Sequence, residues 1–319
     1  MTRWAASDIP DQSGRTAVVT GANSGLGLVT ARELARAGAT VVMACRDPAR
    51  GDWARAQVAS AAPGAEVVLE RLDLANLTSV RELAAKLSAE RPRIDLLINN
   101  AGIMAPPRSL TADGFELQLG TNHLGHFALT GRLLEPLFAA PAARVVTVTS
   151  PMHRVGRIDF DDLQRERRYN RWLAYGQSKL ANLLFARKLQ LRFAGAGVDA
   201  ASMAAHPGYS ATHLQSTGPG AGGGLTARIW TGLLSVGNRV YAQSEEMGAL
   251  PQLYAATAPE VPAGAFVGPS SFDQMRGHPK LVGSAKAGSD MTVAARLWDV
   301  SAELTGVDYA ALEPSSTPG

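Results

Sequence analysis

A tyrosine and a lysine four residues apart form the pair in this sequence with the clearest potential for chemistry. Tyr175 and Lys179 would share one face of a helix, because residues four apart are neighbours on a helix surface. A free phenol has a pKa of about 10 and is a poor base near neutrality. An ammonium group about 4 Å away could favour the phenolate by up to about 4 kcal/mol, equivalent to about three pKa units. We therefore expect Lys179 to lower the pKa of Tyr175 towards neutrality, where the phenol could exchange a proton.

Two further polar residues could complete such a site. Ser150 follows an apolar run, and a hydroxyl at the end of a strand could hold a carbonyl oxygen. A serine that merely closes a turn would look the same. Asn122 is expected within a helix, where asparagine has no propensity advantage. It is either a hydrogen-bonded buried amide or the anchor of a water molecule connected to Lys179.

A glycine-rich turn near the N-terminus could hold the phosphates of a nucleotide. Residues 20–27 read TGANSGLG, between an expected strand and an expected helix. Glycine permits a tight turn, and the free N–H groups of a helix start attract a pyrophosphate. Three glycines could be only a turn, but in this position they predict dinucleotide binding. The contacts expected from this turn are Gly21, Asn23, Ser24, Gly25, Leu26 and Gly27.

The end of the second expected strand indicates which dinucleotide is bound. A carboxylate there would hold the ribose 2′-hydroxyl of NAD, but the sequence has Cys45 followed by Arg46. A guanidinium can form paired hydrogen bonds to a 2′-phosphate. A plain surface arginine is the alternative, and Asp47 followed by Pro48 is typical of a helix start. The sequence therefore predicts NADP(H).

The elements that position these residues follow from the alternation of apolar runs and helical patterns. Helices are expected at about 28–38, after Asp47, from a capping box at Ser79–Glu82, at 115–137 as one long helix, and at 171–194. Strands are expected at 16–20, 40–44, 66–69, 94–98, 144–149, 198–204 and 265–267. This alternation predicts a doubly wound parallel sheet, Rossmann-like, in a three-layer α/β/α arrangement.

The chain shows neither an internal repeat nor a dividing linker. We expect an N-terminal arm over residues 1–13 and a single nucleotide-binding domain over 14–319. Residues 210–241 contain a glycine-rich stretch, which could be a flexible loop or the hinge of a substrate lid. Leu297 and Trp298 could pack on the body of the domain or on a second subunit.

Composition excludes several classes of protein. Of the 319 residues, 46% are apolar and 18% charged, with a formal charge of +3, so the chain is globular and nucleic-acid binding has little support. Cys45 is the only cysteine, which fits a reducing compartment. We expect a cytoplasmic protein without a signal peptide or transmembrane segment. The histidines lack metal-ligand spacing, so no metal is expected.

Six motifs, in order along the chain, give the sequence a family resemblance. They are TGANSGLG, ACRD, NNAGIM, TNHLGHF, YGQSKLAN and HPG. Over residues 14–270 the chain resembles the short-chain dehydrogenases, in the branch that holds the retinol dehydrogenases, the WW-domain oxidoreductase and protochlorophyllide reductase. The resemblance implies that Tyr175 gives or takes the proton and that Lys179 binds the nicotinamide ribose and polarises Tyr175. It also implies that Ser150 orients the carbonyl and that Asn122 supports a proton relay.

The resemblance further implies the remaining cofactor contacts and one wall of the substrate pocket. The contacts are Asp73 and Leu74 at the adenine, Asn99, Ala101 and Gly102 along the cofactor, and Pro207, Gly208 and Thr212 at the pyrophosphate or carboxamide. His206 is expected to support the turn at Pro207 and Gly208. The long interval between Ser150 and Tyr175, residues 153–172, is expected to form the wall.

Two classes of function remain open at this point. The first is an NADP(H)-dependent oxidoreductase of a small-molecule carbonyl or alcohol with a lipophilic body, and the second is an NADP-binding redox sensor or interaction protein with little turnover. The full set of Tyr175, Lys179, Ser150 and Asn122 favours the first, because a sensor would not need a proton relay. Protochlorophyllide reductases are expected to have a cysteine in the active site, whereas Cys45 is expected at the adenosine end of the cofactor. Protochlorophyllide reduction is therefore disfavoured. Assembly into a homo-oligomer stays open.

Overall fold

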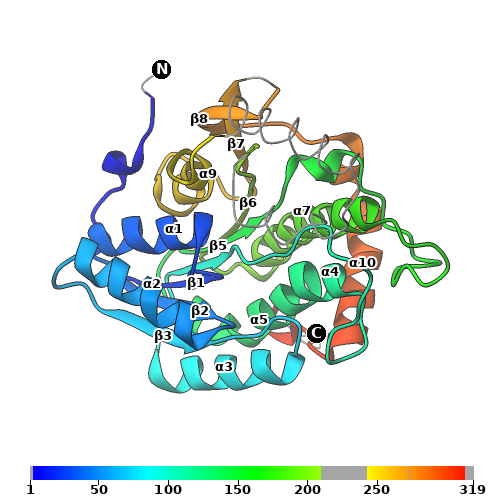
Figure 1. Ribbon diagram of the computed structural model, residues 1–319, viewed down its shortest axis with the longest axis horizontal. Coiled ribbons are helices and arrows are strands. Elements are labelled where there is room, and N and C mark those ends of the chain that lie inside the picture. The colour runs from blue at the N-terminus through cyan, green and yellow to red at the C-terminus, as the bar shows by residue number, and fades with distance from the viewer. Residues whose placement is uncertain (1–2, 210–242, 272, 313–319) are drawn as a thin grey trace, which may run out of the picture.

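An eight-stranded sheet forms the centre of the molecule (Figure 1). The structure is a computed structural model and describes residues 3–209, 243–271 and 273–312. The spatial order of the strands is β3-β2-β1-β4-β5-β6-β7-β8. In chain order the strands are β1 (Thr16–Thr20), β2 (Thr40–Cys45), β3 (Val67–Arg71), β4 (Leu96–Asn99), β5 (Ala143–Val148), β6 (Ala200–Ala205), β7 (Phe266–Ser271) and β8 (Arg276–Leu281).

The strands from β1 to β7 are parallel, which confirms the predicted doubly wound sheet. The strand order reverses between β1 and β4, and ligands of such sheets bind at the carboxyl ends of the strands beside this switch. β8 is antiparallel to β7 and was not predicted. Its sequence, RGHPKL, contains glycine and proline and no β-branched residue, so it carries no strand signal.

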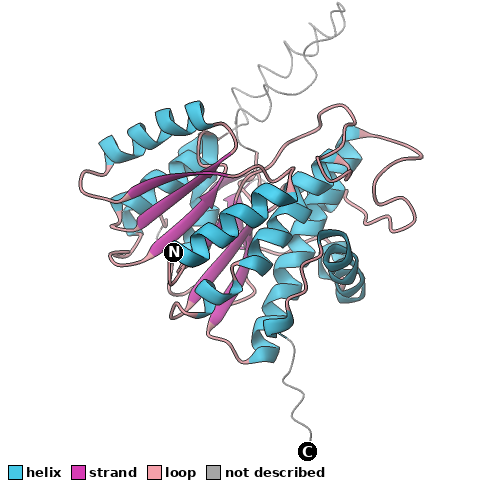
Figure 2. Cartoon of the chain, turned by 90° about the horizontal axis from the view of Figure 1, so that it is seen from below, coloured by secondary structure: helices cyan, strands magenta, loops and turns pink. Residues whose placement is uncertain are grey.

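Helices cover both faces of the sheet (Figure 2). Together with the sheet they give the predicted three-layer α/β/α arrangement. One face carries α1 (Gly25–Arg36), α2 (Pro48–Ala61) and α9 (Glu245–Thr257), and the other carries α3 (Leu77–Glu90), α5 (Gly125–Arg132) and α7 (Arg171–Ala196). The last long helix, α10 (Met291–Thr305), packs outside against α7.

Local capping explains where two of these helices begin. The predicted cap of α2 is confirmed, since the Asp47 carboxylate accepts from the N–H of Arg50 at 3.2 Å. The predicted capping box at Ser79 is wrong. Asn76 caps α3 instead, and the Ser79 hydroxyl accepts from the N–H of Asp73 at 3.0 Å. Asparagine is as good a cap as serine, so the two could not be separated from the sequence.

The helix predicted over 115–137 is helical from Leu117 to Arg132 and from Leu134 to Phe138, but it is not a single regular α-helix. The segment comprises α4 (Leu117–Leu119), a π-helical turn (Gly120–Leu124), α5 and α6 (Leu134–Phe138). Its start is set by the Glu116 carboxylate, which accepts from the N–H groups of Gln118 and Leu119 at 3.0 and 2.8 Å. A π turn contains one extra residue, and such turns frequently occur at functional sites.

The outer helix α10 completes a cluster of aromatic side chains. Trp298 is 4% exposed and stacks on Phe185 of α7, with ring centroids 5.8 Å apart. Tyr309 packs against both Trp298 and Phe127, at 4.5 and 4.9 Å between centroids. Of the two placements considered for Trp298, the structure therefore shows packing on the body of the domain.

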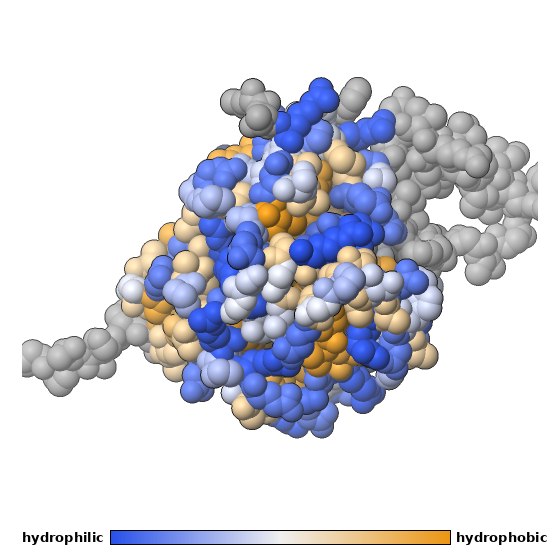
Figure 3. Space-filling view, turned by 90° about the vertical axis from the view of Figure 1, so that its left-hand side faces the viewer, coloured by the Kyte–Doolittle hydropathy of each residue, from blue (hydrophilic) through white to orange (hydrophobic). Residues whose placement is uncertain are grey.

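The N-terminal arm lies against the opposite side of the molecule. Trp4 packs edge-on against Tyr254 of α9, with centroids 5.1 Å apart, and its carbonyl contacts the His278 ring at 3.0 Å. Around α1 and α2, apolar and hydrophilic surface alternate in small areas (Figure 3). Within the described part of the chain, no helix is both long and apolar enough to cross a membrane.

Candidate active site

The turn between β1 and α1 has the shape that a dinucleotide phosphate requires. Gly21 adopts a φ of +66°, and a Cβ on Gly27 would lie 2.3 Å from the carbonyl oxygen of Gly21. Ser24 precedes α1 in extended conformation and makes no capping hydrogen bond with its side chain. The first N–H groups of α1 therefore lack a side-chain cap, as expected of a helix start that receives an anion. These residues fit a dinucleotide cofactor.

Two side chains that were not predicted hold this turn in place. The Cys45 side chain accepts hydrogen bonds from the backbone of Ala22 and Asn23, and burial raises the pKa of the thiol to about 11. Asn100 donates from its amide to the carbonyl of Thr20 at 2.8 Å. Cys45 thus supports the turn as an unreactive thiol. The only sequence signal for Asn100 was its place after the fourth strand.

The side chain of Asn99 does not face the crevice. It is fully buried, and its amide donates to the hydroxyl of Thr130 on α5 at 2.9 Å. Ala101 and Gly102 follow in a half-buried stretch. A Cβ on Gly102 would lie 3.2 Å from both the Asn122 Oδ1 and the Lys179 Nζ atoms. Gly102 thus leaves open a cradle between these two polar groups.

The predicted adenine contacts lie just after β3. The carboxylate of Asp73 accepts from the N–H of Ala75 at 3.0 Å, and the side chain is half-buried. Leu74 is 6% exposed and packs in the core beside Phe127 of α5. The carboxylate of Asp73 is thus held in one orientation by its own turn.

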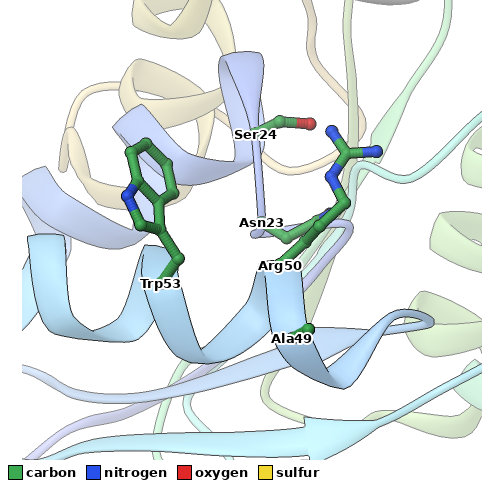
Figure 4. Close-up of a pocket in the computed structure, with 5 residues that line it drawn as sticks. All are labelled: Asn23, Ser24, Ala49, Arg50 and Trp53. Carbon is green, nitrogen blue, oxygen red and sulfur yellow. The ribbon is translucent and has the colours of Figure 1, made fainter.

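Two arginines lie near the glycine turn, of which the sequence predicted one. Arg46 is exposed directly after β2. A pocket of about 400 Å³ next to the turn is lined by Asn23, Ser24, Ala49, Arg50 and Trp53 (Figure 4). In this pocket the guanidinium of Arg50 points towards the Ser24 hydroxyl (Figure 4). Arg50 was missed, although it follows Arg46 by four residues and lies in the first turn of α2.

Ser150, Tyr175 and Lys179 lie together where β5 meets α7. The Thr149 hydroxyl donates to the carbonyl of Lys179 at 2.6 Å, which fixes the strand end against the helix. The Lys179 ammonium lies 5.7 Å from the centre of the Tyr175 ring and donates to the carbonyl of Val148 at 3.3 Å. The Ser150 side chain hydrogen-bonds with Tyr175.

The prediction that Lys179 lowers the pKa of Tyr175 towards neutrality is wrong. Burial raises the pKa of Tyr175 to about 12, while the hydrogen bond with Ser150 acts to lower it. Burial also lowers the pKa of Lys179 to about 8. Burial is the largest cause of both shifts, because removal from water disfavours the charged form of each group. The phenol is therefore protonated at neutral pH.

Asn122 lies in the π turn and is fully buried. Its Oδ1 atom accepts from the N–H of Ile103 at 2.8 Å, and its amide donates to the Ile103 carbonyl and the Ser178 hydroxyl at 3.0 and 2.9 Å. Ser178 in turn donates to the carbonyl of Tyr175 at 2.8 Å. Asn122 therefore links the end of β4 to the helix that carries Tyr175.

The last predicted cofactor contacts follow β6. His206 accepts from the N–H of Gly208 at 3.2 Å, and the side chain of Gln243 donates to the carbonyl of Pro207. Gly208 has a φ of +67°, and a Cβ there would lie 2.3 Å from the Met275 carbonyl. His206 thus supports this turn as expected. Thr212 and the suggested lid over 210–241 lie outside the described residues.

The segment between Ser150 and Tyr175 is fastened to α7 through Gln177. The amide of Gln177 donates to the Leu163 carbonyl at 2.9 Å, and its oxygen accepts from the Arg165 guanidinium at 2.7 Å. His153 is fully buried and bonded through Nδ1 to the carbonyl of Ser150 at 2.7 Å. Among residues 3–209, 243–271 and 273–312, no group of histidine, cysteine and carboxylate side chains could hold a metal ion.

Comparison with known proteins agrees with this geometry. The short chain dehydrogenase family model matches residues 15–218. Retinol dehydrogenase 13 of Homo sapiens is 40% identical over 306 residues, covering 96% of this chain and 88% of that protein. Retinol dehydrogenase 12 of Homo sapiens is 41% identical, covering 93% of this chain and 88% of that protein.

Solved structures of related proteins are also similar to this chain. An uncharacterized protein from Mycobacterium paratuberculosis is 45% identical with a TM-score of 0.79, covering 97% of this chain and 99% of that chain. RhlG of Pseudomonas aeruginosa, in complex with NADP, is 26% identical with a TM-score of 0.60, covering 80% of this chain and 94% of that chain. The chain therefore belongs to the short-chain dehydrogenase family, in its retinol dehydrogenase-like branch, and is a nicotinamide-dependent oxidoreductase of alcohol or carbonyl groups.

Proposed function

We propose that the protein transfers hydride between NADP(H) and a lipophilic carbonyl compound or the corresponding alcohol. The observation that carries the proposal is the grouping of Ser150, Tyr175 and Lys179 at the end of β5, beside the opening that Gly102 leaves. A hydroxyl, a buried phenol and a buried ammonium together supply a hydrogen-bond donor, a proton and a positive charge to one carbonyl group.

In this proposal each residue has one task during reduction. NADPH would supply the hydride when bound. The phenol of Tyr175 is protonated at neutral pH, so it would donate its proton to the carbonyl oxygen, and the Ser150 hydroxyl would orient that oxygen. The charge of Lys179 would stabilise the phenolate left behind and hold the nicotinamide ribose. Oxidation of the alcohol would use the same groups in reverse.

The choice of NADP over NAD is supported by the charges around the glycine turn. Arg46 and Arg50 stand on the side of the turn where β2 ends, and Asn23 and Ser24 share a pocket with Arg50. Arginine pairs with phosphate oxygens through two parallel hydrogen bonds. Two related structures, RhlG and a gluconate 5-dehydrogenase from Beutenbergia cavernae at 26% identity, were solved with NADP.

The lipophilic character of the substrate is supported by exposed apolar side chains in the segment that leads to Tyr175. Three apolar side chains between Ser150 and Tyr175 are exposed, namely Val155 (57%), Trp172 (45%) and Leu173 (47%). Exposed apolar side chains next to a site favour an apolar ligand. The relatives named retinol dehydrogenases act on an apolar alcohol, by their names.

The test is a turnover assay with aldehydes and ketones of increasing alkyl length, including retinal, in which NADPH absorbance is followed. We expect turnover whose kcat/KM rises with alkyl length, because each buried methylene contributes about 0.8 kcal/mol. If the chain binds NADPH but its turnover on every compound equals that of Tyr175→Phe, the enzymatic proposal fails. That result would favour an NADP-binding sensor instead.

A further inference from the structure

A buried histidine joins the π turn to the first strand. His126 is 1% exposed, and its Nδ1 atom lies 3.0 Å from the carbonyl oxygen of Asn122. Its Nε2 atom lies 2.9 Å from the hydroxyl oxygen of Thr20. A carbonyl oxygen can only accept a hydrogen bond, so Nδ1 must carry the proton and Nε2 must accept from Thr20. The two contacts therefore define one tautomer of the ring.

The hydroxyl of Thr20 extends this connection to the fourth strand. Its oxygen accepts from the N–H groups of Asn100 and Ala101, both at 3.0 Å. A hydroxyl has one proton to donate, and the His126 ring is a closer acceptor than the Ile98 carbonyl at 3.3 Å. One imidazole thus completes a network shared by the ends of β1 and β4 and by the π turn.

Asn122 is the residue through which this network reaches the site. The His126 ring holds the main-chain carbonyl of Asn122, while the Asn122 side chain bonds to Ile103 and Ser178. The side chain of Asn122 is also one of the two polar groups beside Gly102. The π turn changes the hydrogen-bond register of the helix at Asn122, where a side-chain donor adds a further bond to the carbonyl. His126 supplies that donor.

Full burial argues against a proton-transfer role for this ring. Burial lowers the pKa of His126 to about 4, with a further contribution from the charge of Lys179. The ring is therefore neutral across the pH range in which a dehydrogenase works. Both of its nitrogens are already engaged inside the protein. The residue can orient its neighbours, but it has no free position for a substrate.

We propose that His126 is a positioning residue, which sets Asn122 in register with the glycine turn through its bonds to Asn122 and Thr20. This inference rests on the proposed oxidoreductase function. Loss of the bond to Asn122 would let the π turn shift relative to Gly102 and Lys179. A misplacement of about 1 Å can lower turnover by about a hundredfold.

Three substitutions at this position separate the two bonds. His126→Phe keeps the ring and removes both bonds. His126→Asn places an amide nitrogen as many bonds from Cα as Nδ1, so it can still donate to Asn122. His126→Gln places its amide oxygen as many bonds from Cα as Nε2, so it can still accept from Thr20 but does not donate to Asn122. The matched control is His123→Phe, since His123 is equally buried in the adjoining π turn but its ring bonds to Ser301 of α10 at 2.9 Å.

The first measurement is kcat per nucleotide-binding site, counted by NADPH titration so that unfolded protein is excluded. We expect kcat to fall about tenfold to a hundredfold in His126→Phe, with a smaller loss in His126→Asn than in His126→Gln. His123→Phe should lose thermal stability but keep kcat within about threefold. Equal kcat in the wild type and His126→Phe, or equal losses in His126→Phe and His123→Phe, would overturn the proposal.

The second measurement does not depend on turnover. In ¹⁵N-labelled protein, His126→Phe should shift the amide resonance of Ile103, whose N–H is bonded to Asn122, whereas His123→Phe should leave it in place. If the wild type turns over no carbonyl compound, the proposed function fails, but the NMR measurement still tests whether His126 positions Asn122. An unmoved Ile103 resonance in His126→Phe would refute it.

Discussion

The two regions that meet at the crevice are built by different means. The glycine turn after β1 is shaped by close contacts between backbone atoms, such as the approach of Gly27 to the carbonyl of Gly21. The region around the π turn and α7 is held by buried side chains, among them Asn122, Ser178 and His126. Substitutions in the first region should therefore weaken nucleotide binding. Those in the second should mainly lower turnover, with an effect on binding expected only at Lys179, which would also hold the nicotinamide ribose.

The largest effect on turnover is expected from Tyr175→Phe, which keeps the ring and removes the proton donor. Because general acid catalysis contributes up to about 10⁴-fold, we expect kcat to fall about a thousandfold while the NADPH dissociation constant changes less than about threefold. Turnover and NADPH titration check this. The control is Tyr169→Phe, also a tyrosine whose pKa burial raises to about 12. A comparable loss in that variant would contradict the assignment.

The next largest effect is expected from Gly27→Ala in the other region. The new Cβ would lie 2.3 Å from the Gly21 carbonyl and 2.6 Å from the Asn100 amide, so the turn must open. We expect NADPH affinity to fall more than about tenfold, measured by calorimetry. Gly195→Ala in α7 meets no atom within 4 Å and should bind normally with slightly higher stability. Normal NADPH binding by Gly27→Ala would show that the close backbone contacts of the glycine turn do not determine nucleotide binding.

A smaller, selective effect is expected from Arg46→Ala. Loss of one phosphate partner should weaken NADPH by about tenfold and leave NADH nearly unchanged, since charge-assisted hydrogen bonds contribute about 1.5–3 kcal/mol. Arg50→Ala should act in the same direction. Arg55→Ala is the control, because Arg55 lies on the same helix and pairs with Asp52. Equal losses for both nucleotides would refute the 2′-phosphate assignment.

The smallest effect concerns pH. The pKa of Lys179 is lowered to about 8 by burial, so the side chain is charged below this pH and loses its charge above it. We expect kcat for reduction to decline as pH rises through about 8, and Lys179→Arg to move this decline to higher pH, because arginine stays protonated. A profile that is identical in both proteins would show that another group titrates.

The same contrast explains what could be read from the sequence. The strands and the glycine turn were predictable, because apolar runs and the glycine spacing of TGANSGLG reflect local backbone geometry. The π turn that contains Asn122 was not, since one extra residue in a turn leaves the apolar pattern almost unchanged. The spacing of Tyr175 and Lys179 predicted their shared face. It could not predict that burial would raise the pKa of Tyr175.

The placement of α10 has a consequence for how copies of this chain could associate. Trp298 lies between Phe185 and Tyr309, with the Arg192 guanidinium 4.7 Å from the centre of its ring. This side of α7 is thereby withdrawn from the surface. Direct pairing of two copies through this face of α7 would require α10 to detach and expose Trp298 to water.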